Sequence, residues 1–157
     1  MTARKPLVLV SGRVQQLQSG DSLNATVTEN NTVTQTADST LIAGQVCYSS
    51  AADHINKAKA DAAGTVKALG LASAAITSGA TGSLQTSGIV TLTTGEWDAA
   101  AGTTGGLTFN TPYYLSAATA GLLTSTAPSV AGQYVKEIGI GISTTELLIT
   151  TPPEILL

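Results

Sequence analysis

The sequence predicts an all-β protein, built as a small antiparallel barrel or sandwich. Threonine fills 25 of the 157 positions, and its β-branched side chain suits a pleated, half-wetted surface. Glycine and proline recur every several residues, with short β-favouring runs between them, which is the spacing of strands joined by tight turns. A partial internal repeat further suggests that two similar β half-domains were produced by duplication.

The chain divides into three predicted regions. Residues 1–18 hold two N-terminal strands, the apolar run 6–10 and the segment 13–18, separated by the turn Ser11-Gly12. Residues 19–43 form an extended polar arm or hairpin. Residues 44–157 form the β-barrel domain, which contains the repeat.

The predicted arm contains a nearly palindromic segment, TVTENNTVTQT at residues 26–36. Val27 and Val33 face each other across Asn30-Asn31, and asparagine tolerates the left-handed backbone of tight turns. The segment therefore indicates a polar hairpin or, equally well, a flexible loop. We expect residues 19–43 to be the least self-packed part of the chain, because they carry little apolar surface to offset their ordering entropy.

The two copies of the internal repeat are residues 46–77 and residues 112–146. Tyr48 and the Ser-Ala-Ala that follows it recur 66 positions later at Tyr114, whereas the Val-Lys-x-Leu-Gly-Leu ending at residue 71 recurs 69 positions later as Val-Lys-x-Ile-Gly-Ile. The prediction is that Tyr48 corresponds to Tyr114 and Gly70 to Gly139.

Local patterns predict the remaining elements. Alternation over residues 134–142 places Ile138, Ile140 and Ile142 on one face of a strand. The Lys- and Ala-rich stretch 57–63 predicts a helix of a turn or two.

Charge and composition restrict the function. Only 11% of the residues are charged and the net charge is −3, whereas nucleic-acid binders cluster lysine and arginine against phosphates. No segment is long enough to span a bilayer. These features predict neither nucleic acid nor membrane as a partner, and they agree with synthesis in the cytoplasm.

The C-terminal half resembles a β module of tailed-bacteriophage surface proteins. The motifs that carry the resemblance are GGL at 105–107, YYLS at 113–116, GLLT at 121–124, GQYV at 132–135 and IG at 138–139. The opening LVLVSGRVQQLQSGD at 7–21 is similar to the N-termini of such proteins. Asn110-Thr111-Pro112 departs from the pattern, because a glycine-containing turn is expected before the tyrosine pair.

The resemblance implies a head decoration (cement) protein, located on the capsid surface of a virion. It would be a homo-oligomer, a trimer first or a dimer second, that binds the major capsid protein and bridges shell subunits. The alternative is a head- or tail-fibre module that binds a host receptor or glycan. The resemblance implies no catalytic residue.

Candidate chemistry in the sequence is sparse, so we expect no enzyme, no cofactor and no metal. His54 beside Asp53 lacks a nucleophile elbow, and adjacent strand residues point to opposite faces. Glu96 and Asp98 flank Trp97 as in a solvated turn, although a glycosidase would also use two carboxylates. The single Cys47 fits a small buried hydrophobe.

The interface candidates are apolar residues that the expected fold leaves outside the core, together with Trp97, for which a core role and an interface role are about equally expected. They are Trp97, Val27, Val33, Ile155, Leu156 and Leu157. Pro152-Pro153 ends the preceding strand, because proline cannot donate to a ladder. We expect the tail 155–157 to dock in a groove, either of its own subunit or of a neighbour or the capsid shell.

Overall fold

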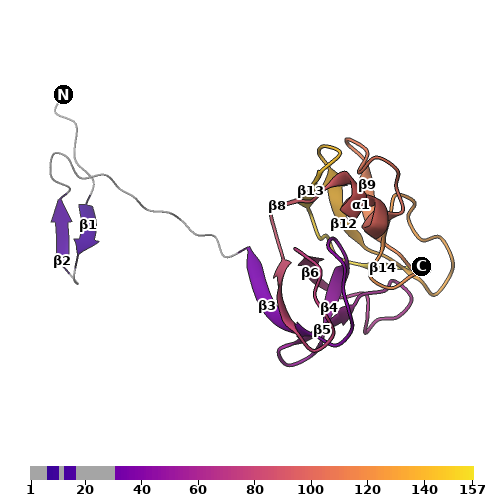
Figure 1. Cartoon of the computed structure of the whole chain (residues 1–157), viewed down its shortest axis with the longest axis horizontal. Helices are drawn as coiled ribbons and strands as arrows, with labels where there is room; N and C mark the ends of the chain where they lie inside the picture. Colours follow the sequence, from indigo (N-terminus) through magenta and orange to yellow (C-terminus); the bar gives the residue numbers. More distant parts are fainter. Residues whose placement is uncertain (1–6, 11–12, 17–30) are drawn as a thin grey trace.

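The structure, a computed structural model, describes residues 7–10, 13–16 and 31–157 (Figure 1). At the N-terminus, β1 (Leu7–Val10) pairs antiparallel with β2 (Arg13–Gln16). These two strands agree with the prediction for residues 1–18. Residues 17–30, with Val27 and the turn Asn30 of the predicted hairpin, lie outside the described residues.

Residues 32–85 form a closed five-stranded barrel, which we call the barrel unit. Its strands are β3 (Thr32–Ala37), β4 (Val46–Ala51), β5 (His54–Lys57), β6 (Ala68–Ala72) and β7 (Thr81–Gln85). The order around the barrel is β3-β5-β4-β6-β7. All pairs are antiparallel except β3 with β5, whose parallel pairing closes the barrel.

The interior of the barrel unit is filled by a small apolar cluster. Its buried members are Ala37, Leu41, Cys47, Ile55, Ala72, Ile76 and Leu84. Cys47 and Ala72 point into this interior, whereas their neighbours Val46 and Leu71 belong to a second, larger core. The walls formed by β4 and β6 are thus buried on both faces, which side-chain alternation along a strand makes possible.

Residues 89–149 form an open five-stranded sheet, which we call the open-sheet unit. Its strands are β8 (Ile89–Thr91), β9 (Pro112–Leu115), β10 (Leu123–Thr124), β12 (Glu137–Gly141) and β13 (Glu146–Ile149). The order is β10-β9-β12-β13-β8, and every neighbouring pair is antiparallel.

The two units share one strand order, as the predicted repeat requires. If the strands of each unit are numbered one to five in chain order, neighbouring strands follow the order 1-5-4-2-3 in both units. The registers match as well: Cys47 pairs with Gly70, and Tyr113 pairs with Gly139. Each of these two ladders is interrupted by a register shift at the same point. The duplication extends beyond the predicted 46–77 and 112–146, to residues 32–85 and 89–149.

At two pairs of equivalent positions, the backbone explains why the repeat keeps a glycine or replaces it. A Cβ atom at Gly70 would lie 2.4 Å from the carbonyl oxygen of Gln85, and one at Gly139 would lie 2.3 Å from that of Leu148. Asn110 takes the place of Gly44 before the paired strands: both have positive φ, 55° and 79° respectively. Their amides donate to equivalent carbonyls, Gly141 and Ala72. The asparagine therefore supplies the left-handed turn expected of a glycine.

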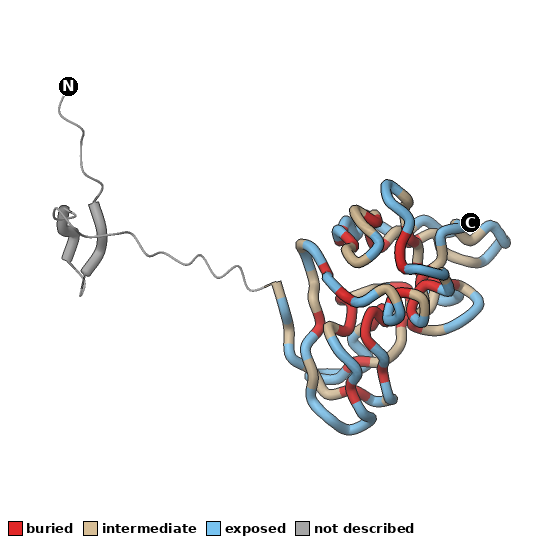
Figure 2. Tube along the Cα trace, turned by 45° about the horizontal axis from the view of Figure 1, so that its top comes forward, coloured by how far each residue is buried: buried red, intermediate tan, exposed pale blue. Residues whose placement is uncertain are grey.

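The units meet in one continuous core. A single cluster joins Val46, Val66 and Leu71 of the barrel unit to Tyr113 and Leu147 of the open-sheet unit. In Figure 2 the buried stretches run through the middle of the folded body, while the exposed residues lie on the surrounding loops. Residues 31–157 are therefore packed as one body with two topological halves.

The only helix among the described residues is α1 (Thr94–Ala101), which lies between β8 and β9. Thr93 caps it, with reciprocal bonds between the Thr93 and Glu96 side chains and backbone amides, and Gly102 ends it in a left-handed conformation. The helix expected over residues 57–63 is wrong: this stretch comprises the end of β5 and turns. Its Lys-Ala alternation gives helical propensity without the apolar stripe that packing requires.

Two further predictions are wrong. The polar arm does not extend to residue 43, because β3 pairs along its length with β7 and Leu41 is fully buried. Long-range pairing outweighs the local palindrome there. Ile138 and Ile140 do not share a face, because the register shift between Glu137 and Gly139 turns Ile138 into the core while Ile140 pairs with the exposed Leu148.

Candidate interaction surfaces

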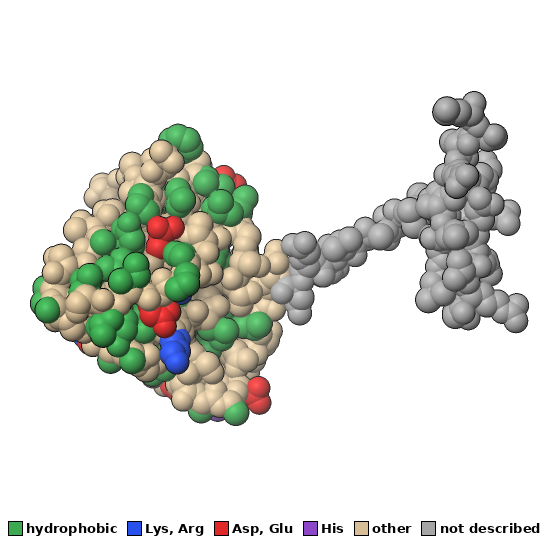
Figure 3. Space-filling view, turned by 180° about the vertical axis from the view of Figure 1, so that it is seen from behind, with side chains coloured by type: hydrophobic (Ala, Val, Ile, Leu, Met, Phe, Trp, Pro, Cys, Tyr) green, Lys and Arg blue, Asp and Glu red, His purple; other side chains and the backbone are tan. Residues whose placement is uncertain are grey.

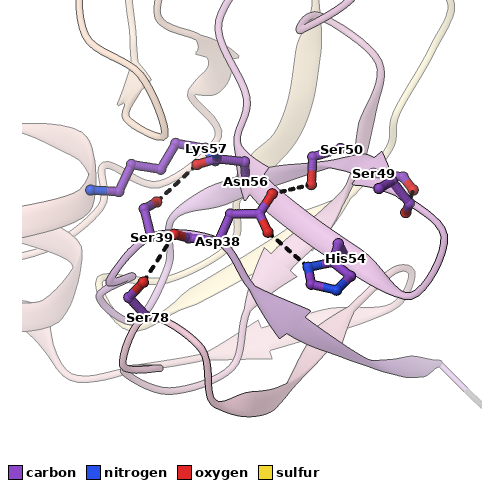
Figure 4. A network of polar contacts seen from close by, with 9 residues as sticks. Asp38, Ser39, Ser49, Ser50, His54, Asn56, Lys57 and Ser78 are labelled. Atoms are coloured by element: carbon purple, nitrogen blue, oxygen red, sulfur yellow. Dashed lines mark hydrogen bonds and ion pairs between the residues drawn. The ribbon is translucent and has the colours of Figure 1, made fainter.

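A polar cluster centred on Asp38 lies at the end of β3, where the barrel closes (Figure 4). One oxygen of its carboxylate lies 2.8 Å from Nδ1 of His54, and the other accepts a bond of 2.5 Å from the Ser50 hydroxyl. The Ser78 hydroxyl donates to the Asp38 backbone carbonyl. The bond from Ser50, followed by that from His54, lowers the pKa of Asp38 from its usual value.

This cluster does not have the arrangement of a catalytic triad. In a triad the imidazole bridges the carboxylate and the nucleophile, whereas here Asp38 stands between His54 and Ser50. The side chains of His54 and Asp38 are 46% and 34% exposed. The geometry fits a structural role, in which the cluster ties the β4–β5 turn to the strand that closes the barrel.

The two carboxylates beside Trp97 are committed to local structure. Glu96 accepts from the amide and hydroxyl of Thr93, which lowers its pKa. Asp98 accepts from the amides of Gly106 and Gly105 and from the Thr103 hydroxyl, and its pKa is likewise lowered, mainly by the two amides. Such bonds hold a carboxylate in its charged form, which is the opposite of what a general acid needs.

The remaining candidate chemistry is also explained by packing. Burial raises the pKa of Cys47 to about 12, so this thiol is a poor nucleophile and fills the barrel interior as predicted. Within residues 31–157 and the two N-terminal strands, no cluster of three potential metal ligands occurs. No helix in this part of the chain has the length and apolarity to cross a membrane.

Trp97 is a core residue, so its prediction as an interface residue is wrong. Its side chain is fully buried, and Nε1 donates to the Thr145 carbonyl at 2.9 Å. It lies on α1 and belongs to the same core cluster as Tyr113 and Leu147 of the open sheet, and its ring comes close to Gly44 of the barrel unit. The capping pattern Thr93-x-x-Glu96 with Gly102 marks this helix in the sequence; a loop was expected because alanine and glycine surround the tryptophan.

Val33 is also not available as an interface residue. It lies on β3 opposite Leu84 and packs against the cluster inside the barrel. Val27, its predicted partner across the hairpin, lies outside the described residues. Val33 therefore pairs with Leu84 within the barrel, in place of the predicted hairpin pairing.

The C-terminal tail combines a fixed backbone with exposed apolar side chains. Strand β14 (Ile155–Leu156) pairs antiparallel with β11 (Tyr134–Val135), and Leu157 exchanges backbone bonds with Gly132 and Gln133. The groove for the backbone thus belongs to the tail's own subunit. The side chains of Ile155, Leu156 and Leu157 nevertheless remain 62%, 60% and 44% exposed.

These three residues and Val130, which is 60% exposed in the loop before β11, form what we call the C-terminal patch. On the face seen in Figure 3, hydrophobic side chains are numerous and charged ones are few. Val130 was not singled out in the sequence, because the Ala- and Ser-rich loop around it gives no periodic signal.

The buried side chain of Lys136 binds the segment that leads into the tail. Its side chain is only 8% exposed; the ammonium donates to the Pro152 carbonyl at 2.5 Å and lies 3.8 Å from the Glu154 carboxylate. A buried lysine is tolerated only when it is partnered in this way. Its counterpart in the barrel unit, Lys67, is exposed, so the buried anchor is specific to the second copy.

Comparison of the chain with protein families, with curated protein sequences and with solved structures finds no match.

Proposed function

We propose that this chain is a structural virion protein, a decoration or cement protein that binds the outside of a tailed-bacteriophage capsid. It would stabilise the capsid by bridging shell subunits, and it would act as a homo-oligomer made in the host cytoplasm. It would have no enzymatic activity and no cofactor.

The observation that carries the proposal is the C-terminal patch. Three large apolar side chains of the tail stand exposed on a backbone that β11 and Lys136 already fix, and Val130 is exposed in the loop before β11. Because the backbone is ordered in advance, binding would cost little conformational entropy. Each side chain that becomes fully buried would contribute roughly 1.5–3 kcal/mol.

Further support comes from the body that presents the patch. The polar clusters at Asp38, Glu96 and Asp98 are used in local hydrogen bonds, as expected of a rigid scaffold. Two of the phage-like motifs lie on paired strands of the open-sheet unit: YYLS overlaps β9, and IG lies in β12.

The alternative, a fibre module for a host glycan, has less support. Glycan recognition favours an aromatic-lined groove, and Phe109 is 73% exposed. However, three hollows on the surface are lined mainly by alanine, serine and threonine, and none of them contains an aromatic side chain.

The test is to mix the purified full-length chain with undecorated capsids and to measure cosedimentation. The full chain is expected to sediment with the capsids and to raise the temperature at which they rupture. Deletion of residues 155–157 is expected to weaken binding at least about tenfold, which corresponds to about 1.4 kcal/mol, because three partly exposed apolar side chains would no longer be covered.

Phe109→Ser provides the matched control, because it removes an exposed apolar side chain outside the patch. Its binding is expected to equal that of the unmodified chain. Failure of the full chain to bind any undecorated tailed-phage capsid, or equal binding after the deletion, would refute the proposal. Thermal unfolding of each variant shows whether the body remains folded.

A further inference from the structure

An apolar row crosses the outer face of the open sheet. In neighbouring strands β8, β13, β12 and β9, direct register partners bring together Ile89, Leu148, Ile140 and Pro112. We call this set the outer row. Ile89 is 46% and Leu148 38% exposed, and the other two are half-buried.

The opposite face of the same strands supplies the core. Val90, Leu147 and Tyr113, which alternate with members of the outer row, are almost completely buried. An antiparallel sheet with one face on a core usually carries polar residues on the other face. Large apolar residues on both faces are typical of strands that are covered on both sides.

The chain itself shows what covers the equivalent row. By strand order and register, Pro112 and Ile140 correspond to Val46 and Leu71 of the barrel unit. Those two residues are fully buried, in the core cluster shared with the open-sheet unit. In the barrel unit, a sheet of the same topology therefore covers this face.

The outer two positions of the row differ between the units. Leu148 and Ile89 correspond to Gln85 and Thr32, which lie where the cover of the barrel unit ends and are half-buried and exposed. The open-sheet unit thus carries apolar residues at all four positions, whereas the barrel unit carries them only at the two that are covered. The difference indicates a cover that spans all four strands.

We infer that a second copy of this chain covers the outer row, with the open sheets of the two copies packed face to face about a twofold axis. A straight apolar row is complementary to itself, as a twofold contact requires, and sheets stack in this way at roughly 10 Å. Glu146 lies beyond one side of the row and Glu137 beyond the other, where the rim of such a contact stays in water.

The inference deepens the self-association in the proposed function, and it selects the dimer over the trimer. It assigns the two apolar surfaces different partners. The outer row binds a second copy, and the C-terminal patch is left free for the shell.

The test uses Ile89→Thr/Leu148→Gln, which gives each position the residue of its counterpart in the barrel unit. The full chain is expected to be a concentration-dependent dimer in analytical ultracentrifugation. The double variant is expected to raise the dimer dissociation constant at least about tenfold, because two apolar side chains lose their cover. Both positions are exposed strand positions, so the melting temperature of the monomer is expected to change little.

Val130→Thr is the matched control, because it makes the same kind of change on the C-terminal patch and should leave the dimer intact. An unmodified chain that remains monomeric at the highest soluble concentration would overturn the inference. So would a double variant that dimerises as well as the unmodified chain.

A cysteine crosslink gives an independent measurement. Leu148→Cys places a thiol near the middle of the outer row, and the native Cys47 is fully buried and cannot compete. With oxidised glutathione, disulfide-linked dimers are expected for Leu148→Cys and not for Val130→Cys. The reverse pattern would place the self-contact on the tail and overturn the inference.

Capsid binding separates this inference from the function on which it rests. If the double variant keeps the dimer but loses the capsid, the shell covers the outer row and the inference is wrong. If the variant loses the dimer and the unmodified chain never binds capsids, the inference stands while the proposed function fails.

Discussion

The barrel unit and the open-sheet unit use one strand order to make two different structures. In the barrel unit the outermost strands, β3 and β5, pair in parallel and close the sheet. In the open-sheet unit their counterparts, β8 and β10, are not paired to each other. The two units also differ in what packs against the inner face of each sheet.

The connection between the first two strands sets that content. In the barrel unit it is the short segment 38–45, which contributes only Leu41 to the apolar cluster in the interior. In the open-sheet unit it is the longer segment 92–111, which contains α1 and brings Trp97 into the core. The comparison teaches that one strand order can give either form: the sheet is closed where this connection is short and open where the connection carries a helix.

The largest effect is expected from Trp97→Ala. It removes the largest buried side chain and should lower the free energy of unfolding by roughly 3–5 kcal/mol. Chemical denaturation measures the change. Trp97→Phe should cost less, because it keeps most of the apolar volume and loses mainly the bond to the Thr145 carbonyl. If Trp97→Ala cost no more than an exposed substitution, the helix would not support the open sheet.

The second prediction concerns the equivalent glycines. Gly70→Ala and Gly139→Ala each force a Cβ atom against a backbone carbonyl at 2.4 and 2.3 Å, and each should cost about 1–3 kcal/mol. Gly95→Ala is the matched control: its Cβ meets nothing within 4 Å, and alanine should stabilise helix α1 by up to about 1 kcal/mol. Clearly unequal costs at Gly70 and Gly139 would break the equivalence of the two units.

The sequence predicted the parts of the fold that rest on repeated identities. Tyr48 and Tyr114, with Gly70 and Gly139, revealed the repeat. The glycines recur because, in both ladders, a neighbouring backbone carbonyl comes too close to leave room for a Cβ atom. It also predicted the buried Cys47. The closure by β3 was missed, because its pairing with β7 joins residues far apart in the sequence and leaves no local signal.

The site was predicted less completely, for identifiable reasons. Ile155, Leu156 and Leu157 were singled out because an apolar stretch after two prolines is unusual; their side chains are exposed, and their interface role stays a prediction. The outer row was missed because one extra residue near Glu137 reverses the alternation, and register shifts of this kind cannot be read from a single strand. Trp97 was misplaced because its helix is too short to show a periodic pattern, although its caps were present.

The third prediction compares the two repeated lysines. Lys136→Met leaves the Pro152 carbonyl without its donor and should cost about 1–3 kcal/mol, with faster hydrogen exchange at the amide of Leu157. Lys67→Met changes an exposed residue and should lie within about 0.5 kcal/mol of the unmodified chain. Equal effects of the two substitutions would show that Lys136 does not anchor the tail.

The smallest effect is expected from two of the three carboxylates with lowered pKa among the described residues, Asp38 in the barrel unit and Asp98 in the open-sheet unit. A carboxylate whose pKa is lower in the folded state adds stability above its unfolded pKa, near 4. That stability is lost as the pH falls through the folded pKa. Between about pH 5 and pH 2 the free energy of unfolding should therefore fall with decreasing pH, and part of the slope should disappear in Asp98→Asn and in Asp38→Asn.

Asp98 accepts two backbone amides that fix the Gly105-Gly106 turn, whereas Asp38 accepts only side-chain donors at its carboxylate. We therefore expect the larger change of slope from Asp98→Asn, measured by urea denaturation across this pH range. A larger change from Asp38→Asn would mean that barrel closure depends more on its polar cluster than the open sheet depends on its turn.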